Sequence, residues 1–176
     1  MTETKKRGRH PKVNETPIEG PSIVLISDLH LTPEAPHILS QFSAFIDSLQ
    51  HVNSLYILGD LFEYWLGDDA AKSLGHLPVE HILQTLTTDG TDVYLIPGNR
   101  DFLIGHDFAS RTGVTILNDE TVHRLFESHV LLLHGDSLCI DDTEHQQFRS
   151  ITKETGWRSR FLKKTILQRE SIAQSI

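Results

Sequence analysis

Short apolar runs recur along the chain from residue 23 onward and predict buried β-strands. They cover residues 23–26, 56–58, 93–96 and 130–133. Each run is apolar at consecutive positions, which is typical of strands covered on both faces. Residues 122–126 precede the last run across a polar segment at residues 127–129, so we expect a hairpin with its turn at that segment.

Two stretches between the first runs repeat apolar residues every three or four positions, as a helix with one buried face does. The members of the first stretch are Leu39, Phe42, Phe45, Ile46 and Leu49, and those of the second are Val79, Ile82, Leu83 and Leu86. This alternation of strand and helix patterns predicts an α/β domain in which sheets are sandwiched by helices. We expect residues 22–155 to form its core.

The two ends of the chain differ from this core. Residues 1–21 are polar, contain proline and glycine and show no periodicity, so we expect a disordered lead. Its Lys-Lys-Arg-Gly-Arg stretch is either an arm for nucleic acid or anionic lipid or a solvated tail. Residues 156–176 predict a basic amphipathic helical segment, which either lies on an anionic membrane surface or packs on its own domain. Its apolar positions are Trp157, Phe161, Leu162, Thr165, Ile166 and Ile172.

Charge and cysteine content narrow the class of protein. Residues 13–157 hold 6 basic and 22 acidic side chains, a net charge of −16, within a chain whose formal net charge is −8. Such a body repels nucleic acid, so we predict no nucleic-acid partner and a protein that concentrates divalent cations. Cys139 has no partner for a disulfide, which is typical of the cytosol, and we expect it to be a small buried residue. An apolar leader and an apolar run of membrane-spanning length are both missing from the sequence.

Polar groups that can bind metal follow each apolar run. Asp28 and His30 follow the first run, Asp60 the second, Asn99 the third and His134 the fourth. The carboxyl ends of strands in an open α/β sheet meet at one crevice, so we expect these five side chains to converge. Taken singly, each is explained by a turn or by a core histidine. All five in order indicate a shared site.

The residue types select the chemistry of that site. Mixed nitrogen and oxygen ligands suit Mn²⁺, Fe²⁺ or Zn²⁺ better than Ca²⁺. The carboxylate of Asp60 has two oxygens and could bridge two ions. Two ions about 3.5–4 Å apart can clamp a phosphoryl oxygen during an in-line displacement. The sequence therefore predicts a two-metal centre for cleaving phosphate esters.

The ordered motifs Asp-x-His, Gly-Asp, Gly-Asn-Arg-Asp and His-Gly-Asp resemble the calcineurin-like metallophosphoesterase superfamily. The segments ISDLHL, LYILGDLFEYWLGDD, PGNRDFLIG and LLLHGDSLCIDD are closer to one family within it, the UDP-2,3-diacylglucosamine pyrophosphohydrolases of lipid A biosynthesis. This resemblance covers about residues 22–175. It implies an α/β sandwich of two mixed β-sheets flanked by helices.

The resemblance also implies an activity and residue roles. Such an enzyme uses two Mn²⁺ ions to hydrolyse the pyrophosphate of a UDP-linked diacylated glucosamine lipid, giving UMP and 2,3-diacylglucosamine 1-phosphate. It works in the cytoplasm, peripherally on the inner membrane. By this resemblance Asp28 and His30 bind one ion, Asn99 and His134 the other, and Asp60 both. Substrate contacts would come from Asn99, Arg100 and Asp142, and residues 156–176 would begin a lid over the acyl chains, with Phe62 and Trp65 either core residues or acyl contacts.

One motif of the superfamily is missing from this sequence. Gly-His-x-His, which supplies a further ligand to each ion, does not occur, and no histidine follows His145. We therefore expect a C-terminally truncated chain whose fold is incomplete at that end. His145 is the first residue to consider as a replacement ligand. Two alternatives to the full activity follow, namely an inactive fragment of that enzyme and a generic metal-dependent phosphodiesterase for soluble substrates.

Overall fold

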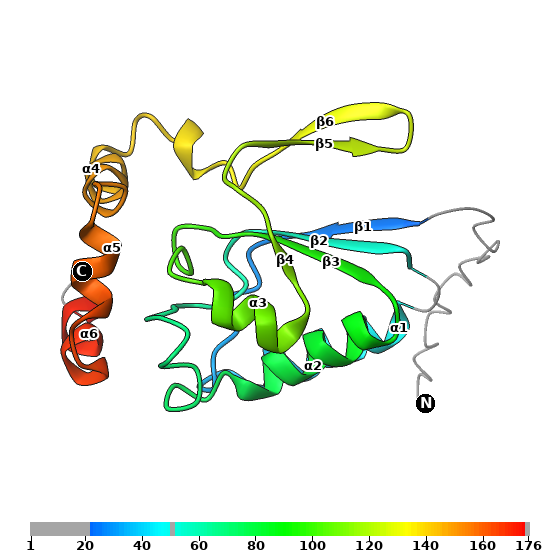
Figure 1. The fold of residues 1–176 in the computed structure, drawn as a ribbon, viewed down its shortest axis with the longest axis horizontal. Coiled ribbons are helices and arrows are strands. Elements are labelled where there is room, and N and C mark those ends of the chain that lie inside the picture. The colour runs from blue at the N-terminus through cyan, green and yellow to red at the C-terminus, as the bar shows by residue number, and fades with distance from the viewer. Residues whose placement is uncertain (1–21, 50–51, 175–176) are drawn as a thin grey trace, which may run out of the picture.

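The computed structural model describes residues 22–49 and 52–174, so the predicted disordered lead lies outside the described residues. Within this part of the chain, four strands form a parallel sheet in the order β1-β2-β3-β4 (Figure 1). Three of them coincide with predicted apolar runs, whereas the short β4 was not predicted. The strands are β1 (Ile23–Ile26), β2 (Ser54–Leu58), β3 (Asp92–Ile96) and β4 (Thr115–Ile116).

Helices α1 (Pro36–Ser48), α2 (Leu77–Thr88) and α3 (His106–Thr112) cover one face of this sheet (Figure 1). The two predicted amphipathic stretches are α1 and α2, and their apolar stripes are buried at Phe42 and Leu83 among other positions. Burying one such side chain contributes about 1.5–3 kcal/mol. The apolar periodicity therefore decides which face of each helix meets the sheet.

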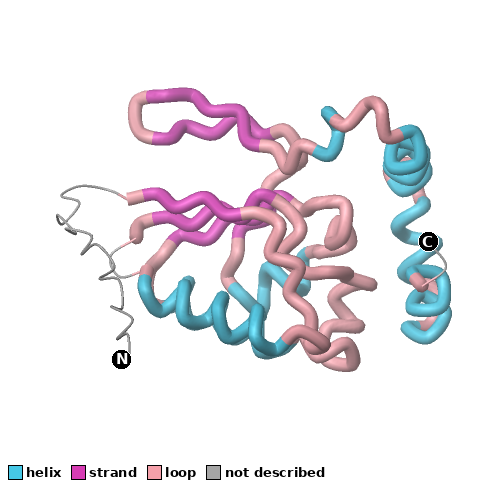
Figure 2. The backbone as a smooth tube through the Cα atoms, turned by 180° about the vertical axis from the view of Figure 1, so that it is seen from behind, coloured by secondary structure: helices cyan, strands magenta, loops and turns pink. Residues whose placement is uncertain are grey.

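Strands β5 (Thr121–Leu125) and β6 (Ser128–Leu132) form an antiparallel hairpin over the other face (Figure 2). Leu125 and Leu132 bury against Tyr56 and Ile96 of the parallel sheet. The predicted turn at residues 127–129 was wrong, because Leu125 pairs with Ser128 and leaves a two-residue loop, the commonest hairpin connection.

The hairpin also departs from the predicted burial. Its outer face is exposed, with Val122 at 62% and Leu131 at 55%, so the run at residues 130–133 is not covered on both faces in the described chain. The predicted two-sheet α/β class is confirmed. Among the described strands, however, one sheet is parallel and the other antiparallel, rather than both being mixed.

The last described elements stand beyond the carboxyl ends of the parallel strands (Figure 1). We call the three helices among them the column. The predicted helical segment after Gly156 is two helices, since Thr165 starts the second with a capping box to Gln168. These elements are the short 3₁₀ helix η1 (Asp136–Leu138) and the column helices α4 (Thr143–Thr152), α5 (Trp157–Leu162) and α6 (Ile166–Ala173).

Arginine side chains fasten the column to the core. Arg158 donates to the carbonyls of Phe102, Leu103 and Ile104 at 3.3, 3.0 and 2.8 Å. Arg169 is buried and donates to the carbonyl of Leu66 and to the carboxylate of Asp69. Basic side chains in this segment thus serve packing on the chain's own domain, one of the two roles that the sequence allowed.

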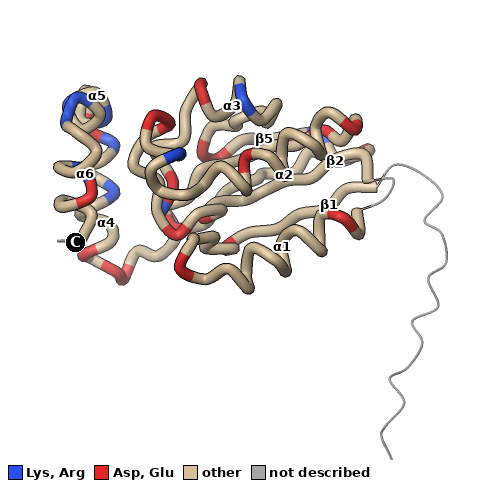
Figure 3. Tube along the Cα trace, turned by 90° about the horizontal axis from the view of Figure 1, so that it is seen from below, with Lys and Arg blue, Asp and Glu red and all other residues tan. Residues whose placement is uncertain are grey.

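Figure 3 shows Lys and Arg positions on the column and Asp and Glu positions in loops of the core. Lys163 and Lys164 are exposed, and Arg160 pairs with Glu154. In the described residues, no helix is long and apolar enough to cross a membrane. Cys139 is exposed, which contradicts the expected burial, because it lies in the irregular segment between η1 and α4.

Candidate metal centre

The loops after β1 and β2 are joined by backbone hydrogen bonds. The amide of Asp28 donates to the carbonyl of Gly59 at 3.1 Å, and the amide of His30 donates to the carbonyl of Asp60 at 3.0 Å. This pairing holds Asp28, His30 and Asp60 at φ values of 56°, 50° and 52°. Such left-handed conformations cost on the order of 1–3 kcal/mol each and persist where the surroundings impose them. They fall on three of the predicted ligands, whose ligand atoms lie within 4.8 Å of one another.

The buried carboxylate of Asp60 lies between two imidazoles. Its Oδ1 accepts a hydrogen bond from the backbone amide of Arg100 at 2.9 Å, which fixes the orientation of the carboxylate. Its Oδ2 lies 3.9 Å from Nε2 of His30 and 3.6 Å from Nε2 of His134. An oxygen in this place can serve a cation on either side, as the predicted bridging role requires.

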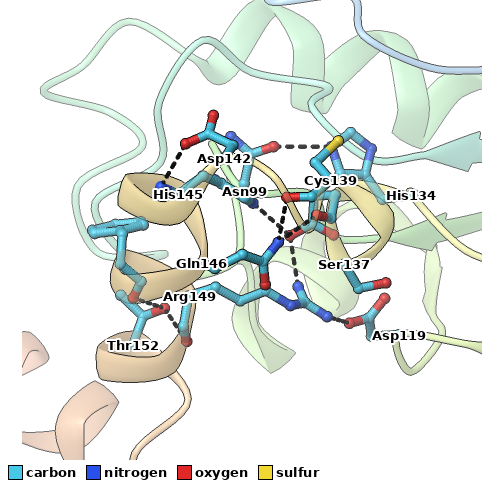
Figure 4. Close-up of polar contacts among 12 residues, drawn as sticks. Asn99, Asp119, His134, Ser137, Cys139, Asp142, His145, Gln146, Arg149 and Thr152 are labelled. Carbon is cyan, nitrogen blue, oxygen red and sulfur yellow. Dashed lines mark hydrogen bonds and ion pairs between the residues drawn. The ribbon is translucent and has the colours of Figure 1, made fainter.

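The imidazole of His134 faces Asn99 (Figure 4). Nδ1 of His134 lies 2.8 Å from the carbonyl oxygen of Leu58, so this nitrogen must be the donor. In the neutral ring Nε2 then carries a lone pair, and it lies 3.0 Å from Oδ1 of Asn99. Nε2 of His134 and Oδ1 of Asn99 thus each direct a lone pair at the other, beside the carboxylate of Asp60. A cation bound between them would stabilise this arrangement. These residues therefore fit a divalent metal.

Two glycines allow these side chains to approach the backbone. A Cβ at Gly59, where φ is 90°, would overlap the imidazole of His134. A Cβ at Gly98 would overlap Oδ1 and the backbone nitrogen of Asp60. Glycine is required at both positions for steric reasons, in addition to the turn geometry that the sequence suggested.

Asp101 binds the two loops that carry Asp60 and Asn99, and it was not predicted to have a role. Its fully buried carboxylate accepts from the amides of Gly98 and Leu61 at 2.7 and 2.8 Å, so it ties the loop after β3 to the loop after β2. Burial, together with the nearby charge of Asp60 and against these hydrogen bonds, raises the pKa of Asp101 to about 6. Its place in the Gly-Asn-Arg-Asp motif was the available signal.

Glu63 is a second residue that sequence reasoning missed. One of its carboxylate oxygens lies 3.0 Å from Nδ1 of His30, and the other lies 3.7 Å from Nη1 of Arg100. This leaves Nε2 of His30 facing Asp60. Glu63 thus connects a predicted metal ligand with a predicted phosphate-binding arginine, which a sequence pattern does not reveal.

The other predicted residues lie at the rim of this centre. The side chain of Arg100 is half-exposed. Asp142 caps α4, since its Oδ1 accepts from the amide of His145 at 2.9 Å. Nε2 of His145 lies 3.3 Å from the carboxylate of Asp136, and His145 does not join the group formed by Asp28, His30 and Asp60.

A pocket of about 470 Å³ opens between the core loops and the column. Glu63, Asn99, Arg100, Asp142 and His145 line its polar part. Its apolar part is lined by aromatic side chains from both the core and the column, namely Trp65, Phe102, Phe148, Trp157 and Phe161. Both aromatic residues left open by the sequence, Phe62 and Trp65, are buried in the core. Trp65 packs on Phe62 and also lines the pocket.

The fold and these side chains define an α/β protein with a candidate divalent-metal centre at the ends of its strands. The family of calcineurin-like phosphoesterases matches residues 21–172, and the chain belongs to this family.

Among curated proteins, the chain is 43% identical over 156 residues to a UDP-2,3-diacylglucosamine hydrolase of Aromatoleum aromaticum, with 88% of this chain and 63% of that protein covered. It is 44% identical over 152 residues to the protein of the same name from Stenotrophomonas maltophilia strain R551-3, covering 86% and 61%. The chain thus spans about three fifths of the length of these relatives. Among solved structures, Pseudomonas putida nuclease MPE matches with a TM-score of 0.43 and 24% identity, covering 57% of this chain and 49% of that one.

Proposed function

We propose that the chain carries the catalytic site of a metal-dependent pyrophosphohydrolase. Its substrate is UDP-2,3-diacylglucosamine, and its products are UMP and 2,3-diacylglucosamine 1-phosphate. The observation that carries this proposal is the carboxylate of Asp60, which lies between His30 and His134 beside an aromatic-lined pocket. The names of the relatives support the choice of substrate.

Two Mn²⁺ ions are the proposed cofactors. Asp28, His30 and Asp60 would hold one ion, and Asp60, Asn99 and His134 would hold the other. The mixed nitrogen and oxygen donor set suits Mn²⁺ and similar transition metals. When bound, such ions would polarise a phosphoryl oxygen and lower the pKa of a bound water molecule, which makes hydroxide available at neutral pH.

The chain's own residues orient the substrate. The half-exposed guanidinium of Arg100 can grip two pyrophosphate oxygens, and Glu63 limits where it points. Asn99 and Asp142 lie on the polar side of the pocket and can bind the head group. The hydrogen bond from the amide of Arg100 to Asp60 links the proposed phosphate-binding loop to the proposed bridging carboxylate.

The apolar part of the pocket supports a lipid substrate over a soluble one. The whole pocket has a volume of about 470 Å³, which lies within the range of about 300–1,000 Å³ that is usual for small-molecule sites. Core and column both contribute aromatic rings, with Phe102 and Trp157 at a centroid distance of 5.8 Å. A generic phosphodiesterase for soluble substrates would not require this surface. We place the protein in the cytoplasm, peripherally on the inner membrane where such a lipid resides.

The test is a comparison of substrates for the purified chain with Mn²⁺. We expect only slow UMP release from UDP-2,3-diacylglucosamine, because the sequence holds no Gly-His-x-His segment to supply a further ligand to each ion. Release from UDP-glucosamine, which lacks the acyl chains, should be slower still. Faster turnover of a soluble diester such as bis(p-nitrophenyl) phosphate would favour the generic phosphodiesterase. Absence of turnover with bound Mn²⁺ would overturn the proposed activity and favour the inactive fragment.

A further inference from the structure

The candidate ligand His134 follows β6, the second strand of the hairpin, by two residues. The hairpin contacts the parallel sheet through a small apolar cluster that includes Tyr56 and Leu132. Two acidic residues mark its open end, since Asp119 precedes β5 and Asp136 follows His134 by two residues. A contact that holds these two carboxylates restrains the segment that carries His134, in addition to the bond between Nδ1 of His134 and the carbonyl of Leu58.

Arg149 of α4 contacts both carboxylates. Its Nη1 lies 2.6 Å from Oδ2 of Asp136, and its Nη2 lies 2.6 Å from Oδ2 of Asp119 (Figure 4). The side chain of Arg149 is 17% exposed and that of Asp136 is 8% exposed, so solvent weakens their ion pair little. A guanidinium can hold two carboxylates in a fixed geometry because its donors form a rigid fork.

Gly135 lies between His134 and Asp136, so a restraint on Asp136 acts on the backbone next to His134. Gly135 has a φ of 103°, and no atom lies within 4 Å of the place where its Cβ would be. No side chain packs on this turn at Gly135, which is held by hydrogen bonds instead: the amide of Leu138 donates to the carbonyl of Gly135 at 3.0 Å. Three residues of α4 restrain the segment at Asp136: Arg149 and His145 contact its carboxylate at 2.6 and 3.3 Å, and the side-chain amide of Gln146 donates to its carbonyl at 3.1 Å. Of these, Arg149 is the residue that also binds Asp119.

We propose that Arg149 is a positioning residue for the metal centre. By clamping both ends of the hairpin, it holds Nε2 of His134 against Oδ1 of Asn99 and the carboxylate of Asp60. This inference rests on the proposed function, because it takes His134 as a metal ligand. It assigns to α4 a role in the metal centre besides lining the pocket.

Lys153 provides a matched control within the same cluster. Its Nζ lies 2.7 Å from the same Oδ2 of Asp119, and its ion pair in the described chain is with Asp119 rather than with Asp136. Lys153→Met therefore removes one positive charge from the cluster while leaving the contact between Arg149 and Asp136 in place. In a cluster that only balanced charge, the loss of either cation would have the same effect on Mn²⁺ binding.

The experiment is a calorimetric titration of the whole chain with Mn²⁺, which requires no turnover. We expect two binding steps in the unmodified chain. Arg149→Met should weaken one step about 10–100-fold, the usual effect of losing a partner that orients a ligand, and leave the other step unchanged. Lys153→Met should leave both steps within about threefold of the unmodified chain, well below that orientation effect.

Equal effects of Arg149→Met and Lys153→Met, or two unchanged steps in Arg149→Met, would overturn the inference. If Arg149→Met does not fold, Arg149→Lys decides, because a lysine reaches only one carboxylate. One weakened step in that variant supports the inference, and unchanged binding overturns it. An unmodified chain that binds no Mn²⁺ would overturn the proposed function itself, and the inference with it.

Discussion

Crowding around the carboxylate of Asp60 leaves no room for a side chain at Gly98. A Cβ there overlaps Oδ1 and the backbone nitrogen of Asp60. Gly98→Ala should therefore displace the carboxylate, lowering the free energy of unfolding by about 1–3 kcal/mol. Mn²⁺ affinity should fall as well, and both quantities can be followed by denaturant titration and calorimetry.

Gly90→Ala is the control for this substitution. Gly90 has a φ of 98°, and no atom lies within 4 Å of the position that a Cβ would take, so alanine there brings backbone strain without crowding. It should reduce stability and leave Mn²⁺ affinity unchanged. Normal Mn²⁺ binding by Gly98→Ala would mean that the position of Asp60 does not matter for the metal.

His76 makes stability depend on pH. It is 1% exposed, and its ring stacks on Trp65 at a centroid distance of 5.4 Å. Burial lowers the pKa of His76 below its ordinary 6.5, against the hydrogen bond with the backbone of Tyr64 and the charges of Glu34 and Glu80. The unfolded chain then binds more protons than the folded chain as pH falls below about 6.5. The folded state is therefore favoured above that pH and loses stability below it.

His76→Phe should remove this dependence, because phenylalanine keeps the ring packing and does not titrate. Urea unfolding at pH 7.5 and pH 5.5 measures it. We expect the unmodified chain to lose more stability than the variant between these two values. An equal loss in both proteins would show that the protonation of His76 does not contribute to stability over this range.

The residues of the candidate site could be predicted because they follow apolar runs in a fixed order. Asp60 and His134 needed no knowledge of packing to be singled out. Glu63 and Arg149 could not be found in this way, because charged residues of their kind usually lie on solvated surfaces. Their partners are distant in sequence, as with Arg149 and Asp119, and become neighbours only in the folded chain.

At the scale of elements, burial decides how well the sequence predicts structure. Strands β2 and β3 and helices α1 and α2 carry strong apolar patterns and were predicted. The turn of the hairpin was misplaced because polar Ser128 and His129 belong to a strand with an exposed face. Helix α4 was missed because it buries no residue fully and is fixed by its cap Asp142 and by Arg149.

Arg169 fastens α6 to the core. It is 2% exposed, whereas Asp69 is largely exposed, so the hydrogen bond to the buried carbonyl of Leu66 matters more than the ion pair. Arg169→Met should destabilise the docking of α6 by about 1–3 kcal/mol, since that carbonyl loses its partner. Hydrogen exchange of the α6 amides should accelerate, with little change in β2.

Lys163→Met is the comparison for Arg169→Met, since Lys163 is exposed and lies just before α6. Its exchange pattern should match that of the unmodified chain. If both variants exchange alike, α6 is held by its apolar contacts and Arg169 is dispensable.

At the scale of the molecule, basic positions lie along the column and acidic positions lie in loops of the core (Figure 3). The proposed membrane contact would use the exposed Lys163 and Lys164, since Arg158 and Arg169 bind the core. Each lysine near an anionic surface contributes about 1 kcal/mol. Replacing both by methionine should therefore weaken binding to phosphatidylglycerol vesicles about 30-fold, as measured by co-sedimentation.

Arg124→Met is the control and removes one charge, half of the charge that the double substitution removes. Arg124 is exposed on the hairpin and distant in sequence from the column. This variant should bind the vesicles as the unmodified chain does. A loss of about fivefold in Arg124→Met, the share of one charge, would mean that overall charge rather than the column governs the contact.

The carboxylate of Asp60 is central to the proposed chemistry, because it is expected to lie between two metal ions. Anomalous diffraction at the manganese edge from crystals grown with Mn²⁺ measures this directly. We predict two peaks about 3.5–4 Å apart on either side of Asp60, one beside Nε2 of His30 and the other beside Nε2 of His134. A single peak, or peaks away from Asp60, would contradict the two-metal centre.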